Sequence, residues 1–315
     1  MQTRALGRAG PQVSVLGLGC NNFGSRIGPA ESVAVVDRAI DLGVTLFDVA
    51  DIYGSPSGAF EEILGQALGA RRKSVVLATK FGGDMGSGSR NASRAYVMSA
   101  AEASLRRLRT DYIDLYQLHF PDGVTPIDET LRALADLIDQ GKVKYIGCSN
   151  LPAAAVREAQ ATARAIGVSG YVCSQDEYSL VVRDAEAELI PALLDEGMGL
   201  LPYFPLASGL LTGKYRRGAA PGAGTRFAAW RGLGDRYMTA ANLDLVERLE
   251  TFARAQDMAL LDLAFAWLLA HPPVASVIAG ATSARQVEAN AAAAARTLTA
   301  DQLAAVDAIC AGRAV

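Results

Sequence analysis

The stretch IDLYQLHFPDGVTPIDETLRALADLIDQGKVKYIGC, residues 113–148, carries the pattern that decides the fold. It opens and closes with short apolar runs that are typical of strands, at 113–118 and 143–148. Between the two runs, one helix face is predicted by the four-three-four spacing of Ile127, Leu131, Leu134 and Ile138. The segment therefore predicts a strand, a helix and a second strand.

The same alternation of apolar runs and helical periodicity extends along the whole chain. Strands are predicted at Val15–Gly19, Thr45–Val49, Val75–Thr79, Ile113–Leu118, Val143–Cys148, Tyr171–Ser174, Gly199–Pro202 and Ser276–Ala279. Strands that are apolar throughout and separated by helices indicate a parallel sheet whose faces are covered. Eight such units without a linker between them predict an α/β protein that forms one (β/α)8 TIM barrel domain over residues 1–315.

Three segments bear on this prediction of a barrel. A doubly wound open sheet is the structural alternative, but Gly17-Leu18-Gly19 lacks the third glycine of its phosphate loop. Residues 3–13 predict a short N-terminal hairpin that covers the barrel floor, with Gly10-Pro11 near its turn. Residues 216–234, rich in Gly, Ala and Arg, predict a long loop, and such loops are usually functional or mobile.

The overall composition is that of an ordinary globular protein, with 50% hydrophobic and 20% charged residues. A net charge of −3 gives no reason to expect binding to nucleic acid or to an acidic membrane. No signal-peptide core opens the chain, and the most apolar long stretch, Ala259–Ala270, is too short to cross a bilayer. Four dispersed cysteines form no zinc or redox motif. We therefore expect a soluble, cytoplasmic protein without a metal.

Polar residues recur at the ends of successive predicted strands. In chain order they are Asp48, Lys80, His119, Ser149 with Asn150, Gln175 and Tyr203, and Gly280 follows the eighth strand. In a (β/α)8 barrel these strand ends converge on the face that carries catalytic residues. Each of them alone has a plainer explanation: a turn aspartate, a surface lysine, a packed core histidine. Their occurrence as a set favours an active site.

Tyr53, in the segment DVADIYG, adds the group that carbonyl chemistry requires. Reduction of a carbonyl needs a hydride on carbon and a proton on oxygen. The pKa of a tyrosine is ordinarily about 10; the ammonium of Lys80 would lower it, and Asp48 would hold that lysine charged and in place. His119 would orient the substrate oxygen while Tyr53 acts as general acid in reduction and general base in oxidation. Because none of these groups donates a hydride, a nicotinamide cofactor is implied.

Seven motifs along the chain resemble those of the aldo-keto reductase superfamily. They are GLGCNNFG (17–24), FDVADIYG (47–54), LATKFG (77–82), DYIDLYQLHFPD (111–122), GKVKYIGCSN (141–150), YFPLASGLLTGKY (203–215) and IAGATSARQVEAN (278–290). As a set they are highly specific and cover essentially the whole chain. The resemblance implies a barrel with a catalytic tetrad formed by Asp48, Tyr53, Lys80 and His119, and a nicotinamide cofactor extended across the barrel top.

The resemblance also implies cofactor contacts at defined positions of this sequence. The carboxamide would be held by Ser149, Asn150 and Gln175, and the nicotinamide would stack on Tyr203. The loop similar to the one that folds over the pyrophosphate contains Pro205, Leu206, Ser208, Gly209 and Lys214. The adenosine end would be bound by Gly280, Thr282, Gln286 and Asn290, where the last helix opens. Taken singly, Tyr203 could be a packed loop aromatic, Lys214 a surface charge and Asn150 a helix cap.

The preferred cofactor follows from the charges expected near its 2′-phosphate. Many relatives carry a basic residue near the positions of Thr282 and Ser283, where this chain has hydroxyls, and the basic residue nearest to them here is Arg285. Many relatives also carry an acidic residue where this chain has Ala289. Lys214 and Arg226 could still meet a 2′-phosphate. NADP(H) is therefore the favoured cofactor, and NAD(H) is the alternative.

The substrate pocket is expected to be lined by loop residues that follow the strands. The candidates are Asn22, Phe23, Phe81, Phe120, Phe227 and Trp230. An apolar pocket with few charges suits aldehydes, ketones or uncharged cyclic alcohols, and no arginine is clearly placed for a phosphate or carboxylate. The partner is thus a small carbonyl or alcohol; the oligomeric state stays open.

Three functions remain compatible with the sequence. The first is an NADPH-dependent carbonyl reductase, and the second is an NAD(P)⁺-dependent dehydrogenase of a sugar or cyclic alcohol that uses the same tetrad in reverse. The third belongs to another class, because the superfamily includes channel-associated β-subunits: a cofactor-binding regulatory subunit.

Overall fold

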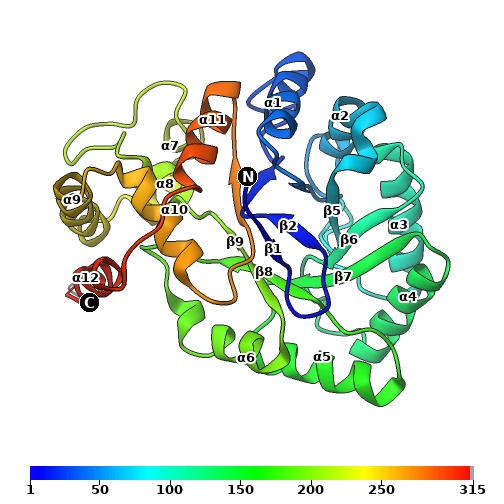
Figure 1. Ribbon diagram of the computed structural model, residues 1–315. Coiled ribbons are helices and arrows are strands. Elements are labelled where there is room, and N and C mark those ends of the chain that lie inside the picture. The colour runs from blue at the N-terminus through cyan, green and yellow to red at the C-terminus, as the bar shows by residue number, and fades with distance from the viewer. Residues whose placement is uncertain (313–315) are drawn as a thin grey trace.

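Eight parallel strands form the barrel of the computed structural model, which describes residues 1–312 (Figure 1). They are β3 (Leu16–Gly19), β4 (Leu46–Asp48), β5 (Val76–Phe81), β6 (Ile113–Leu118), β7 (Val143–Ser149), β8 (Cys173–Glu177), β9 (Gly199–Tyr203) and β10 (Val277–Gly280). Each strand pairs with its neighbour in chain order, and β10 pairs with β3. Between β9 and β10, the barrel closes through a parallel bridge from Leu200 to Val274. The predicted (β/α)8 fold is confirmed.

The helices surround this sheet, as Figure 1 shows. The α-helices are α1 (Pro29–Asp41), α2 (Ala59–Leu68), α3 (Arg94–Leu108), α4 (Ile127–Asp139), α5 (Ala153–Ile166), α6 (Leu189–Glu196), α7 (Arg226–Ala229), α8 (Arg231–Tyr237), α9 (Ala240–Ala255), α10 (Leu260–Ala270), α11 (Ala284–Ala293) and α12 (Ala300–Ala311). Three 3₁₀ helices are η1 (Gly69–Ser74), η2 (Asp184–Glu186) and η3 (Ala207–Thr212). Within the part described, no helix is both long and apolar enough to cross a membrane.

The predicted N-terminal hairpin is present as β1 (Thr3–Ala5) and β2 (Gln12–Ser14). Its side chains Leu6 and Val13 are fully buried in the apolar cluster that also contains Leu115. The backbone N–H of Arg8 donates to the carbonyl of Gly197, just before β9 begins. The hairpin therefore covers the amino-terminal ends of the strands and leaves the opposite end of the barrel open to a cavity.

The boundaries of several elements differ from those predicted. Strands β5 and β8 extend further than expected, so Lys80 and Gln175 lie within strands rather than at or beyond their ends. Their polar side chains are tolerated there because both bond to Asp48 inside the barrel. The segment 216–234, expected as a loop, contains the short helix α7 and most of α8.

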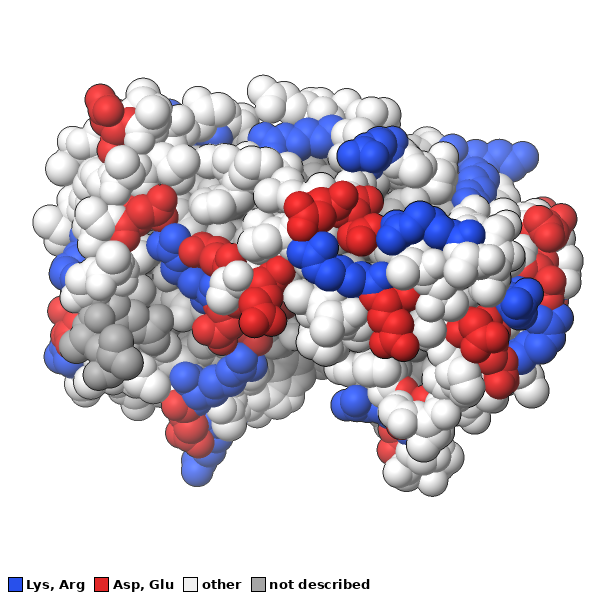
Figure 2. Space-filling view, turned by 90° about the horizontal axis from the view of Figure 1, so that it is seen from below, with Lys and Arg blue, Asp and Glu red and all other residues white. Residues whose placement is uncertain are grey.

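Basic and acidic side chains are interspersed on the face of the molecule in Figure 2. Ion pairs also join neighbouring helices; for example, Arg157 of α5 lies 2.7 Å from Asp195 of α6. That face therefore carries no extended patch of one sign.

The barrel interior offers a direct test of the packing. Leu115→Ala removes a side chain that is fully buried in the inner cluster, so it should lower the free energy of unfolding by about 2–5 kcal/mol. Val124→Ala, at a side chain that is 83% exposed, is the control and should change it by less than about 0.5 kcal/mol. If denaturant unfolding gave the same change in free energy for Leu115→Ala and Val124→Ala, this packing of the barrel interior would be contradicted.

Candidate active site

A cavity of about 750 Å³ lies at the carboxyl ends of the barrel strands. Three members of the predicted tetrad line it, namely Asp48, Tyr53 and His119. So do all the predicted cofactor contacts, which are Ser149, Asn150, Gln175, Tyr203, Pro205, Leu206, Ser208, Gly209, Lys214, Arg226, Gly280, Thr282, Gln286 and Asn290. The structure thus gathers residues from all parts of the chain around one space.

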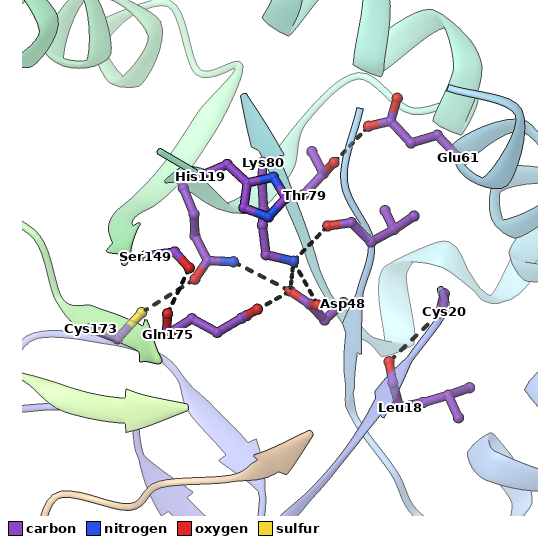
Figure 3. Close-up of polar contacts among 12 residues, drawn as sticks. Leu18, Cys20, Asp48, Glu61, Thr79, Lys80, His119, Ser149, Cys173 and Gln175 are labelled. Atoms are coloured by element: carbon purple, nitrogen blue, oxygen red, sulfur yellow. Dashed lines mark hydrogen bonds and ion pairs between the residues drawn. The ribbon is translucent and has the colours of Figure 1, made fainter. Parts of the chain in front are cut away.

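Lys80 lies behind the cavity wall and is fully buried. Its Nζ donates to both carboxylate oxygens of Asp48, at 2.8 and 2.7 Å, and to the carbonyl of Val49 at 3.0 Å, as Figure 3 shows. Burial alone would lower the pKa of Lys80, but Asp48 and Tyr53 outweigh burial and raise its pKa. The lysine is therefore a permanently charged group in an apolar barrel.

Asp48 is the point where polar side chains of several strands meet (Figure 3). Besides Lys80, its Oδ1 accepts hydrogen bonds from Gln175 at 2.9 Å and from Gln117 at 3.3 Å. These donors come from β5, β6 and β8, so one carboxylate ties together strands on different sides of the barrel. Gln117 was missed by the sequence reasoning, although its spacing of two from Leu115 places both side chains on the same face of β6.

Tyr53 lies in the turn between β4 and α2, above this pair. Its ring centroid is 5.5 Å from Nζ of Lys80 and 5.9 Å from the His119 ring, which it meets edge-on. Burial raises the pKa of the Tyr53 phenol, and the opposing effect of Lys80 does not cancel that rise. The expected net lowering of this pKa is therefore wrong for the protein alone. Tyr53 is protonated at neutral pH and available as a proton donor.

His119 is a buried, neutral imidazole at the cavity wall. Its ring stacks on Phe120 at 4.3 Å between centroids. Burial, followed by the charges of Lys80 and Arg90, lowers the pKa of His119 to about 2. Its Nδ1 has no hydrogen-bond partner in residues 1–312. A neutral imidazole carries one N–H donor and can form a hydrogen bond to an uncharged ligand such as a carbonyl oxygen.

Ser149, Asn150 and Tyr203 form a connected polar wall next to His119. The amide Nδ2 of Asn150 donates to the carbonyl of His119 at 3.1 Å and to Oγ of Ser149 at 2.8 Å. The hydroxyl of Tyr203 donates to Oδ1 of Asn150 at 2.9 Å. The alternative role of Asn150 as a helix cap is wrong, because α5 begins at Ala153 and Pro152 occupies its cap position.

Another part of the cavity lining collects positive charge. Arg26, Lys214 and Arg226 line it, and none of them forms an ion pair with a carboxylate of residues 1–312. Burial is the main cause that lowers the pKa values of Lys214 and Arg226, and repulsion from Arg26 adds to it. Three cations held together without a counter-charge create a positive potential that attracts anions. Arg26 lies in the loop after β3 and was not predicted.

The backbone beside these cations also suits a phosphate group. In η3, Ala207, Ser208 and Gly209 have positive φ angles of 45°, 56° and 103°. The Oγ of Ser208 is buried and has no hydrogen-bond partner in the described chain. A Cβ at Gly209 would lie 2.9 Å from Nζ of Lys214, so only glycine lets the lysine approach this closely. The unused hydroxyl and the unpaired cations fit the phosphates of a dinucleotide.

A third region of the cavity lies at the start of α11. Gln286 turns back so that its Oε1 accepts from the backbone N–H of Thr282 at 2.9 Å and from its hydroxyl at 3.1 Å. Gly280 packs closely on the loop after β3, because a Cβ there would lie 2.7 Å from Nδ2 of Asn22. Helix α11, with Ser283 as its cap, is followed by α12 and is therefore not the last helix.

Several predicted substrate-pocket residues do not reach the cavity. Asn22 and Phe120 line it, but Phe23, Phe81 and Phe227 are buried elsewhere, and Trp230 is 42% exposed outside the lining. Phe81 follows Lys80 in β5 and so points to the other face, where it packs against Tyr116. Phe227 stacks on Tyr215.

Further residues that sequence reasoning missed line the cavity. They include Cys20, Asn21, Phe204, Thr212, Ala223, Gly224 and Thr225. Most come from the loops after β3 and β9, where no periodicity indicates which side chains point inward. Among residues 1–312, no group of three or more His, Cys, Asp and Glu side chains could hold a metal ion.

The fold is a (β/α)8 barrel with one large cavity at the carboxyl ends of its strands, and comparison with known proteins identifies the family. The Aldo/keto reductase family model matches residues 15–311, so the chain belongs to that family. It is 39% identical over 298 residues to a probable voltage-gated potassium channel subunit beta of Oryza sativa subsp. japonica, covering 92% of this chain and 90% of that protein.

Two bacterial relatives carry enzyme names. The chain is 37% identical over 305 residues to the uncharacterized oxidoreductase YrpG of Bacillus subtilis (strain 168), covering 91% of this chain and 89% of the relative. It is 33% identical over 303 residues to the L-glyceraldehyde 3-phosphate reductase of Escherichia coli (strain K12), covering 92% and 86%. These matches support an oxidoreductase of carbonyl compounds.

The buried ion pair can be tested without any ligand. Asp48→Ala leaves the Lys80 ammonium buried and unpaired, so it should lower the free energy of unfolding by about 3–5 kcal/mol. Asp48→Ala combined with Lys80→Met removes both charges and should recover most of that loss in denaturant unfolding at pH 7. If the double variant were no more stable than Asp48→Ala, the unpaired charge of Lys80 would not be the cause of the lost stability.

Proposed function

We propose that the protein is an NADP(H)-dependent carbonyl reductase that interconverts an aldehyde or ketone with its alcohol. One observation carries the proposal: a charged Lys80–Asp48 pair and a protonated Tyr53 stand at the same cavity that is also lined by a cluster of cations without carboxylate partners. The first arrangement suits proton transfer to a carbonyl oxygen, and the second suits the phosphates of a dinucleotide.

The proposed roles of the residues follow from their surroundings. When bound, the nicotinamide supplies or accepts the hydride. Tyr53 donates the proton to the carbonyl oxygen in reduction and takes it back in oxidation. Lys80 stabilises the phenolate left behind, and Asp48 keeps that lysine charged and in place. His119, neutral throughout the physiological range, donates a hydrogen bond to the substrate oxygen and orients it.

NADP(H) is the cofactor that these charges favour. Lys214 and Arg226 lie without carboxylate partners in the described chain, and the missed residue Arg26 adds a third cation. NADP(H) carries a 2′-phosphate that NAD(H) lacks, so it would relieve more of the repulsion among these three cations. Thr282, Ser283 and Ala289 supply no further charge at the adenosine end, and NAD(H) therefore stays the alternative cofactor.

The substrate class is a small aldehyde or ketone. Tyr53, His119 and Phe120 give the catalytic end an aromatic wall, which suits an uncharged carbonyl compound. The relative named L-glyceraldehyde 3-phosphate reductase supports reduction of an aldehyde. The reverse reaction, oxidation of a sugar or cyclic alcohol with NAD(P)⁺, uses the same groups and is the alternative working direction.

A regulatory subunit of a membrane channel is the second candidate function. The observation that favours it is the 39% identity to the Oryza sativa protein named as a channel subunit beta. A regulatory subunit would need the cofactor site but not rapid turnover, so the two candidates differ in the rate of carbonyl reduction.

Tyr53→Phe tests the proposed proton donor. The ring stays and only the hydroxyl is lost, so kcat should fall by about a hundredfold to ten-thousandfold while the Kd for NADPH changes by less than about twofold. Stopped-flow reduction and fluorescence titration measure the two quantities separately. Full activity in this variant would remove Tyr53 from the mechanism.

Lys214→Gln combined with Arg226→Gln tests the phosphate site. Charge-assisted hydrogen bonds to phosphate contribute about 1.5–3 kcal/mol each, so NADPH binding should weaken at least about tenfold more than NADH binding. Arg217→Gln, at a side chain that pairs with Glu247 on the surface, is the matched control. An equal loss of affinity for both cofactors would count against a 2′-phosphate at these residues.

A further inference from the structure

Asp176 is a buried carboxylate that the catalytic proposal does not use. Its side chain belongs to β8 and is only 7% exposed. Cys173 and Gln175 of the same strand face the barrel interior, so Asp176 points to the outer side of the strand. There its Oδ1 accepts the backbone N–H of Asn150 at 3.1 Å, and its Oδ2 accepts the hydroxyl of Ser174.

The charge of Asp176 is not balanced by a cation. Of the buried carboxylates in residues 1–312, Asp48, Glu61 and Asp114 form ion pairs, whereas Asp51 and Asp176 do not. Burial raises the pKa of Asp176 to about 6, hydrogen bonds from Ser174 and Asn150 oppose that rise, and no cation contributes. At neutral pH it is therefore ionised but uncompensated, a costly arrangement for a buried group.

The negative charge acts on the cavity. Asp176 lies directly behind Asn150, which lines the cavity and bonds to Tyr203. After burial and Glu177, Asp176 is the next cause that raises the pKa of the Tyr203 phenol. Three of the titratable groups around it, Cys148, Cys173 and Tyr203, have raised pKa values and stay neutral. Two charged groups near Tyr203, Glu177 of the same strand and Arg236, form an ion pair with each other at 2.5 Å.

Charge is unevenly distributed around the cavity. Lys80 and Asp48 cancel and His119 is neutral, while Arg90 lies over the Phe120 ring on the His119 side. On the Asn150 side, Asp176 is a negative charge without a cation beside it. Arg26, Lys214 and Arg226 form the positive part of the lining. A ligand that bears phosphates near those cations and a positive ring near Asn150 would complement these charges.

From this distribution we infer that Asp176 selects the oxidation state of the bound cofactor: its charge strengthens binding of NADP⁺, whose nicotinamide ring is positive, relative to NADPH, whose ring is neutral. The inference rests on the proposed function, since it needs the carboxamide of the nicotinamide to be held by Ser149, Asn150 and Gln175. Asp176 touches neither reactant; it acts through the electrostatic field. Because NADP⁺ is the oxidised product of carbonyl reduction, this preference favours the reductive direction on the enzyme.

Asp176→Asn isolates the charge from the hydrogen bonds. The amide oxygen still accepts the N–H of Asn150, and the amide NH₂ can donate to the hydroxyl of Ser174. The measured quantity is the ratio Kd(NADPH)/Kd(NADP⁺), obtained by calorimetric or fluorescence titration at pH 8. Loss of one nearby charge in a partly screened site should lower this ratio by about three- to tenfold. Asp195→Asn, whose parent side chain is 64% exposed on α6, is the matched control and should leave the ratio unchanged.

The wild-type protein provides a second readout that does not depend on the variant folding. In the wild type, Kd(NADPH)/Kd(NADP⁺) should fall as the pH drops from 8 through about 6, because Asp176 becomes neutral. In Asp176→Asn the same ratio should not change with pH. Titration of the 2′-phosphate occurs in both cofactors and cancels in the ratio.

The outcomes separate the inference from the proposed function. Absence of binding of both cofactors to the wild type would overturn the proposed function and this inference with it. Tight binding of both, with a wild-type ratio that is independent of pH or is unchanged in Asp176→Asn, would overturn the inference alone.

Discussion

The hydrogen-bonded ion pair between Lys80 and Asp48 is the interaction on which the rest of the site depends. A buried ammonium is stable only with a partner and with its remaining protons bonded, and Asp48 and Val49 meet both requirements. The same carboxylate accepts bonds from Gln117 and Gln175, so its position is fixed by several strands. The Lys80 ammonium thereby stays beneath Tyr53. Without that positive charge, the Tyr53 phenol would hold its proton too tightly for transfer.

The second constraint is the separation of charge along the cavity. The cations Arg26, Lys214 and Arg226 repel one another, and the buried carboxylate of Asp176 has hydrogen-bond donors but no cationic partner in the described chain. Both arrangements cost stability in the protein alone, and a ligand of complementary charge would relieve that cost. If the proposed dinucleotide binds here, the charges that meet it are already in place, which keeps reorganisation small.

The eight strands and the convergence of polar residues at their ends could be predicted from the sequence, because the spacing of apolar residues and the residue that follows each strand are local properties. Predictions that depend on which side chains are buried in the folded chain were wrong. Phe23, Phe81 and Phe227 pack away from the cavity, and alternation along β5 could have shown this only for Phe81. The pKa of Tyr53 is raised rather than lowered, since desolvation depends on the whole fold. Arg26 and Asp176 gave no local signal, because a loop arginine and a strand aspartate are ordinary in isolation.

The most direct measurement is the consumption of NADPH, compared with NADH, by the wild-type protein in the presence of a nitro-activated benzaldehyde, followed by loss of nicotinamide absorbance. The account predicts turnover with both the hydride donor and the aldehyde present, faster with NADPH than with NADH, and none when either is omitted. Tight binding of both cofactors with no turnover of this or any other small aldehyde or ketone would contradict it and favour the regulatory function.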